Sequence, residues 1–205
     1  MTLTPLDQHD PRLRQVCAPV SRAALRDRQQ QLEIEALLDF VYGASVKTAG
    51  PGGQRDRSRP NTVGLSANQV GIMKQICVLD LAIGRRGYTD MHVLVNPRIV
   101  WSSKAQTEKS EGCVNFKTVW GVTHRSRTVR VAAMDRSGNE LELKLTGWPA
   151  ALIQHEIDHL NGHLFIDRLD DPAHAHYVPL EEYSAYRRTK AKEWDKFVDV
   201  SADVV

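Results

Sequence analysis

The segment QHEIDHLNG, residues 154–162, holds two histidines and a glutamate at a spacing that suits metal chemistry. On a helix, residues four positions apart share one face, so His155 and His159 can direct both imidazoles at one point. Glu156 follows the first histidine, which puts its carboxylate near that point in a different direction. This is the H-E-x-x-H pattern, in which two histidines bind a metal ion and the glutamate acts as a base toward water. A solvated helix with two chance histidines is the weaker interpretation.

A metal site of this kind needs a third protein ligand, and the sequence offers two kinds of candidate. One is Cys113 in the segment EGCVNF, because a thiolate and two imidazoles leave a fourth position for water. The other is a downstream glutamate, Glu181 or Glu182, which would complete a metallopeptidase site. The metzincin pattern is excluded, since it requires a histidine at position 165, where this chain has Phe. The residues alone leave the cysteine and a downstream glutamate open.

The composition is that of an ordinary globular protein. A length of 205 residues fits one domain, and 41% hydrophobic with 25% charged residues is typical of soluble chains. A net charge of +2 provides no basic surface for nucleic acid, and no apolar run reaches the length of a membrane span. The N-terminus lacks the charged-then-apolar order of a signal peptide. Three cysteines, Cys17, Cys77 and Cys113, are an odd and sparse set, so we expect a cytoplasmic protein without disulfides.

Apolar periodicity predicts the elements that must position the motif. A helix is expected over residues 21–43 with Ser21 as its N-cap, followed by a long loop over residues 45–62 that is rich in Gly, Pro and Arg. Four strand-like runs follow, the last two around the turn DRSGN: residues 75–82, 91–100, 127–134 and 140–145. A C-terminal helix is expected over residues 179–198.

The motif helix itself is expected to be buried. Trp148-Pro149 opens it, because proline is favoured in a first turn, and Asn161-Gly162 is a typical helix stop. Most of its residues outside the motif are apolar. The order of elements predicts an α+β fold, with mostly antiparallel sheets around a central helix that carries H-E-x-x-H, in a single domain over residues 1–205.

Three segments, taken in order, resemble the motifs of the peptide deformylase family. VGLSANQVG (63–71) looks like the family's G-x-G-L-A-A-x-Q segment, EGCVN (111–115) looks like E-G-C-L-S, and QHEIDHLNG (154–162) matches H-E-x-D-H in full. The segments DPRLRQVCAPV (10–20) and HLFIDRL (163–169) are also similar to family sequences. The resemblance covers nearly the whole chain except the 45–62 loop, and three ordered motifs are far more specific than H-E-x-x-H alone.

The resemblance implies removal of the formyl group from the N-terminal formylmethionine of new polypeptides, with release of formate and a free amine. The family's metal ligands fall on Cys113, His155 and His159, and its general acid and base falls on Glu156. Similar deformylases commonly use one ferrous ion, with zinc, nickel or cobalt as replacements. The expected partners are N-formylmethionyl peptides of nascent chains, met at the ribosome, with no nucleic-acid site and no membrane.

The resemblance also assigns the groups around the reacting carbonyl. The oxyanion donors fall on the Gln69 side chain and the Val114 backbone N–H. The remaining family positions near the substrate path correspond to Gly64, Leu65, Glu111, Gly112 and Arg125, of which Glu111 is expected to support the site by hydrogen bonding.

Three residues depart from the family pattern. Thr62 stands where the first motif usually has Gly, Ser66 replaces an Ala, and Asn115 replaces a Ser. All ligands and the base are retained, so the departures bear on substrate fit and rate more than on the type of chemistry. They leave open a divergent hydrolase that acts on another N-acyl substrate.

Overall fold

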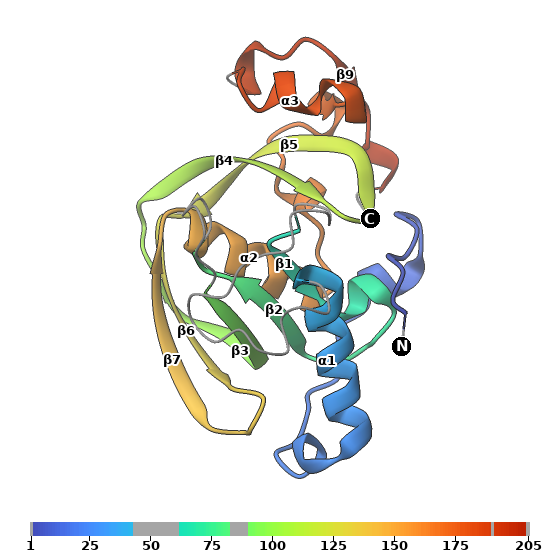
Figure 1. Cartoon of the computed structure of the whole chain (residues 1–205). Helices are drawn as coiled ribbons and strands as arrows, with labels where there is room; N and C mark the ends of the chain where they lie inside the picture. The colour runs from blue at the N-terminus through green and yellow to red at the C-terminus, as the bar shows by residue number, and fades with distance from the viewer. Residues whose placement is uncertain (1, 43–61, 83–89, 190, 204–205) are drawn as a thin grey trace.

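A single helix lies between two antiparallel sheets in the computed structural model, which describes residues 2–42, 62–82, 90–189 and 191–203 (Figure 1). This helix, α2 (Trp148–Leu160), carries the H-E-x-D-H motif. Of the expected 45–62 loop, Thr62 alone lies within the described residues. The antiparallel sheets and few helices confirm the expected α+β class.

The first sheet packs its apolar face against one side of α2. It has five strands in the order β1-β2-β3-β6-β7, all paired antiparallel: β1 (Gly64–Ser66), β2 (Ile76–Asp80), β3 (Met91–Ser102), β6 (Thr128–Met134) and β7 (Glu140–Thr146). Cys77, Leu94 and Val131 of this sheet form one buried cluster with Ile153 and Leu160 of α2. The four strand-like runs predicted from the sequence are therefore confirmed as β2, β3, β6 and β7.

The second sheet covers the other side of the helix and was not predicted. Its order is β4-β5-β8-β9, with β4 (Gln106–Cys113), β5 (Phe116–Ser126), β8 (Ala175–Tyr177) and β9 (Phe197–Val198). The buried positions on β4 and β5 include Glu111, Thr123 and Arg125, so the usual alternation of apolar and polar residues is hidden. Polar side chains point inward here because they contact polar residues of α2: Glu111 contacts His155, and Arg125 contacts Asp158.

The motif helix begins and ends where the sequence predicts. Pro149 lies in its first turn, and Asn161 is its C-cap. Gly162 follows with φ of 77°, a left-handed conformation that glycine adopts without steric cost. A Cβ at this position would lie 2.5 Å from the carbonyl oxygen of Arg14, so the N-terminal segment also requires glycine here.

The first helix is shorter than predicted. Ser21 accepts a hydrogen bond from the Ala24 N–H at 3.1 Å, but this starts a 3₁₀ turn over Ala24–Arg26 rather than a long helix. Asp27 then adopts an extended conformation and accepts from the Gln29 N–H at 2.7 Å, which starts α1 (Arg28–Tyr42). The strong Asp N-cap therefore divides the stretch that periodicity alone treats as one helix.

The prediction of one C-terminal helix over residues 179–198 is wrong. The chain there forms short turns at Leu180–Glu182 and Ala191–Glu193, the single-turn helix α3 (Tyr183–Tyr186) and the strand β9. Strand pairing decides this, because β9 pairs antiparallel with β8 and extends the second sheet (Figure 1). Aromatic rings also pack against one another across this segment: the ring centroids of Tyr186 and Trp194 lie 5.1 Å apart. A straight helix would hold these two residues farther apart. None of the helices within the described ranges is long and apolar enough to cross a membrane.

Candidate active site

Two turns of α2 and the end of β4 bring together three side chains that could hold a metal ion, Cys113, His155 and His159. Nε2 of His155 lies 3.2 Å from Nε2 of His159, and Sγ of Cys113 lies 3.4 Å from the latter. All three donor atoms lie within 4.8 Å of one another. In a tetrahedral site with metal–ligand distances of about 2.0–2.3 Å, donors lie about 3.3–3.8 Å apart. The cluster therefore fits one transition-metal ion with little rearrangement.

The two downstream glutamates do not lie at the histidine cluster. Glu181 and Glu182 belong to a short exposed turn, and Glu182 forms an ion pair with Lys196 at 2.5 Å. Among the described residues, Cys113 is the third member of the histidine cluster and neither glutamate joins it. The metallopeptidase alternative loses its third ligand for this reason.

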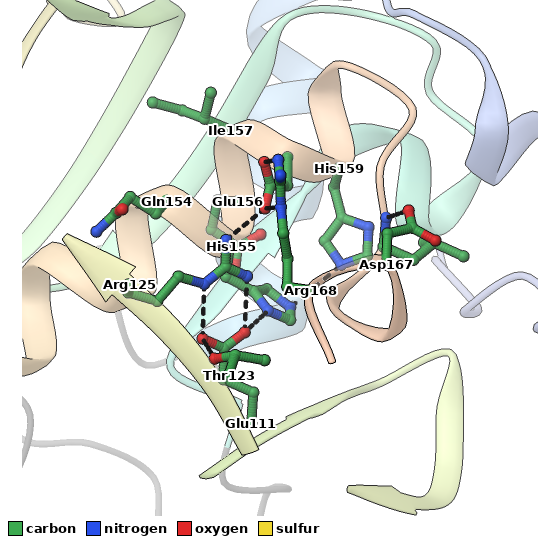
Figure 2. Close-up of polar contacts among 12 residues, drawn as sticks. Glu111, Thr123, Arg125, Gln154, His155, Glu156, Ile157, His159, Asp167 and Arg168 are labelled. Atoms are coloured by element: carbon green, nitrogen blue, oxygen red, sulfur yellow. Dashed lines mark hydrogen bonds and ion pairs between the residues drawn. The ribbon is translucent and has the colours of Figure 1, made fainter. Parts of the chain in front are cut away.

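Glu111 contacts His155 at Nδ1, the ring nitrogen that faces away from the cluster. Its Oε2 lies 2.9 Å from Nδ1 of His155, and its Oε1 accepts from the Thr123 hydroxyl at 2.6 Å (Figure 2). A carboxylate at Nδ1 places the imidazole proton there, which leaves Nε2 unprotonated and directed at the cluster. Arg125 completes the arrangement by donating from Nε and Nη2 to both oxygens of Glu111, each at 2.8 Å. Glu111 therefore orients an imidazole of the candidate metal cluster.

Arg125 does not lie where a substrate could meet its charged group. Its side chain is 4% exposed, and its third donor, Nη1, pairs with the Asp158 carboxylate. Arg168 also donates to the Asp158 carboxylate, at 2.7 Å. We therefore replace the expected substrate contact of Arg125 with a positioning role behind Glu111 and His155. Sequence reasoning missed Thr123, Asp158 and Arg168, although Asp158 stands inside the quoted motif.

Glu156 is buried beside the first sheet. Ser66, at the end of β1, donates from its hydroxyl to Oε2 of Glu156 at 2.8 Å. A Cβ on Gly64 would lie 2.5 Å from Oε1 of Glu156 and 2.9 Å from Leu152, so only glycine fits against the carboxylate. Leu65 between them is fully buried in the core. The β1 strand thus lies directly against the proposed base.

Gln69 reaches the cluster from the 3₁₀ turn that follows β1. Its Oε1 accepts from the Ser66 backbone N–H at 2.7 Å, so Nε2 must point away, toward Sγ of Cys113 at 3.2 Å and Oδ1 of Asn115 at 3.2 Å. Asn115 in turn donates to the backbone carbonyls of Gln69 and Leu6. Val114 lies in the turn between Cys113 and Asn115, and Gly112 faces the Trp120 ring across β5. The structure gathers Gln69 and the β4–β5 turn around the thiol.

Burial and charge shift the protonation of these groups. Burial raises the pKa of Glu156 above that of a free glutamate. Burial opposes ionisation of Glu111, but hydrogen bonds from Arg125 and His155 outweigh it and lower the pKa of Glu111. Burial lowers the pKa of His159, which keeps that imidazole neutral and able to coordinate.

The family model for polypeptide deformylases matches residues 5–175. A peptide deformylase of Methylocella silvestris is 33% identical over 86% of this chain and 81% of its own length. The chloroplastic peptide deformylase 1B of Solanum lycopersicum is 37% identical over 67% of this chain, which spans 45% of that longer protein. A solved peptide deformylase of Legionella pneumophila superposes with a TM-score of 0.67 at 31% identity, over 91% of this chain and 92% of that one.

These matches agree with the site built from the residues, since the matched region contains the cysteine, both histidines and the glutamate. The chain belongs to the polypeptide deformylase family, the hydrolases that remove the N-formyl group from nascent polypeptides.

Proposed function

We propose that Cys113, His155 and His159 hold one divalent metal ion and that Glu156 moves the protons during hydrolysis of N-formylmethionyl peptides. The observation that carries this proposal is the meeting of three donor atoms within 4.8 Å, with the Glu156 carboxylate next to Gly64 on the adjoining strand. Two imidazoles and a thiolate leave one coordination position open, as catalytic sites require. Residues 1–205 act as a single catalytic domain in this proposal.

Cys113, His155 and His159 would hold a divalent ion, which would supply Lewis acidity for attack by water at neutral pH. Ferrous iron is the proposed native ion, with zinc, nickel and cobalt as replacements, because one thiolate and two imidazoles suit all four. Glu111 contributes by holding Nδ1 of His155 at 2.9 Å, which keeps Nε2 available for coordination.

Glu156 acts twice in the reaction. It accepts the proton of the attacking water and later gives that proton to the departing amine as the formyl C–N bond breaks. The raised pKa of the buried carboxyl suits both tasks, because it brings proton uptake closer to the working pH. Formate and a peptide with a free N-terminal amine are the products.

Gln69 and Val114 stabilise the charge that develops on the formyl oxygen. Nε2 of Gln69 donates from beside the thiol, and the Val114 N–H donates from the β4–β5 turn. Because both hydrogens of Nε2 already meet Cys113 and Asn115, the oxyanion must replace one of these partners. Gly64, Leu65 and Gly112 line the approach of the peptide backbone. The proposed place of action is the cytoplasm, near the ribosome, where formylated chains emerge.

The test is formate release from formyl-Met-Ala-Ser by protein loaded anaerobically with ferrous iron. Acetyl-Met-Ala-Ser is the matched substrate, because it differs by one methyl group on the reacting carbonyl. We expect rapid formate release and little acetate. A preference for the acetyl peptide, or for another N-acyl group, would instead support a divergent hydrolase, and activity that persists after removal of the metal would contradict the proposed site.

A further inference from the structure

The hydroxyl of Ser66 is buried against the catalytic carboxylate, and no role has been assigned to it so far. Its Oγ lies 2.8 Å from Oε2 of Glu156 and 2.8 Å from the backbone carbonyl of the same residue. The serine is fully buried. The hydroxyl is a side-chain donor to the Glu156 carboxylate, and the Ser66 backbone also interacts with that carboxylate.

The two oxygens of Glu156 have different surroundings. Oε2 accepts from Ser66, whereas Oε1 lies against Gly64, so close that a Cβ there would be 2.5 Å away. Gly64 belongs to the strand that lines the proposed peptide path. Oε1 is therefore the oxygen on the side where the reacting group is expected, and Oε2 is the oxygen held by the protein.

Rotation of a carboxylate about its last torsion is soft, with broad and roughly two-fold preferences. Leu152 places apolar atoms near Gly64 and offers no hydrogen bond to the carboxylate. The hydrogen bond from the Ser66 hydroxyl to Oε2 restricts this rotation. Catalytic groups must be held close to their productive geometry, and small misplacements cost rate.

Ser66 is itself fixed in place. It pairs with Cys77 in the β1–β2 register, and its backbone N–H donates to Oε1 of Gln69 at 2.7 Å. One residue therefore holds the proposed base with its side chain and the proposed oxyanion donor with its backbone. Ser66→Ala removes the hydroxyl contact with Glu156 and leaves the backbone contact with Gln69. The effects of the two contacts on turnover can therefore be measured separately.

We infer that Ser66 is a positioning residue, whose hydroxyl anchors Oε2 of Glu156 and leaves Oε1 as the oxygen that exchanges protons beside Gly64. This inference rests on the proposed function, in which Glu156 is the acid and base. The hydroxyl acts through Glu156 and makes no contact with the peptide, so its loss slows turnover without weakening substrate binding.

The experiment compares Ser66→Ala, Glu156→Ala and the double variant, all loaded with ferrous iron to the same content. Ser66→Ala is expected to lower kcat roughly 10-fold with KM unchanged, because one hydrogen bond to a charged group is lost. In the Glu156→Ala background the same change is expected to have no further effect, since the group that Ser66 orients is gone. Ser66→Thr, which keeps the hydroxyl, is expected to retain most of the activity.

Ser110→Ala is the matched control. Its hydroxyl also makes one internal hydrogen bond, to Tyr186 at 2.7 Å, but on the side of β4 that packs against the C-terminal segment. Its kcat should stay near that of the wild type. Unchanged kcat in Ser66→Ala would overturn the inference, as would an equal loss in the Glu156→Ala background. Loss of metal or of folding in both Ser66 variants would make the residue structural. Absence of formate release by the wild-type protein would instead overturn the proposed function, and this inference with it.

Discussion

The Glu111 carboxylate and the His155 imidazole meet at 2.9 Å, and the other contacts of Glu111 all come from buried donors on β5. Thr123 donates to Oε1, and Arg125 donates to both oxygens. A fully satisfied carboxylate cannot rotate without breaking several hydrogen bonds, so the imidazole that it holds is fixed in both tautomer and orientation. The second sheet thereby positions the His155 imidazole that the helix carries.

Glu111→Gln tests this relationship at the metal. The amide keeps the shape of the side chain but loses the charge and offers a donor where an acceptor is needed. We expect metal affinity to fall about 10- to 100-fold, as is typical when the partner of a coordinating histidine is removed. Competition with a chelator measures it. Glu108→Gln on the same strand is the control, and equal affinity in both variants would contradict the assignment.

Arg125→Met tests the buried ion pair. It leaves the Glu111 charge buried and short of its main partner, so the free energy of unfolding should fall by about 3–5 kcal/mol. Arg130→Met is the matched control, because Arg130 pairs with Glu142 on an exposed surface, where such pairs contribute about 0–1 kcal/mol. Urea unfolding of metal-free protein measures both. Similar losses in the two variants would mean that Arg125 does not carry a buried charge network.

Glu156→Ala separates the proton carrier from the ligands. The three donors remain, so we expect a full metal content. Turnover should fall by about 10²- to 10⁴-fold or more, because Glu156 serves both the attack of water and the departure of the amine. KM should change less than kcat. Metal analysis and formate release are measured on one preparation. Loss of the metal would make Glu156 structural, and retention of rate would require another base.

Cys113→Ala should abolish stoichiometric metal binding, whereas Cys17→Ala and Cys77→Ala should leave it intact. Burial raises the pKa of Cys17 to about 11 and raises the pKa of Cys77 as well, so both thiols stay protonated at pH 8. Iodoacetamide should therefore modify neither in the folded protein. Mass spectrometry of the alkylated protein and metal analysis of the three variants check this. A Cys113→Ala protein with a full metal complement would contradict the ligand set.

Local patterns in the sequence predict much of the secondary structure of this protein. The four strand-like runs predict β2, β3, β6 and β7: β6 and β7 alternate every two residues, and β2 is a short, wholly buried apolar run. The i,i+4 spacing of His155 and His159 predicts two imidazoles on one helix face, because helical geometry depends only on nearby residues. The C-terminal segment follows no such rule: pairing of β9 with β8 overrides its modest helical pattern.

The contacts that complete the site depend on the tertiary structure alone. Cys113 meets His159 across 46 residues of sequence, Glu111 meets His155 across 44, and Ser66 meets Glu156 across 90. The residues by themselves left Cys113 and the downstream glutamates as equal candidates for the third ligand, and the three ordered motifs favoured Cys113 by family resemblance. Periodicity encodes which face a side chain occupies, but not which distant strand will lie against that face. Packing of the two sheets on α2 decides that, and it also turned Arg125 from an expected substrate contact into a buried partner of Glu111.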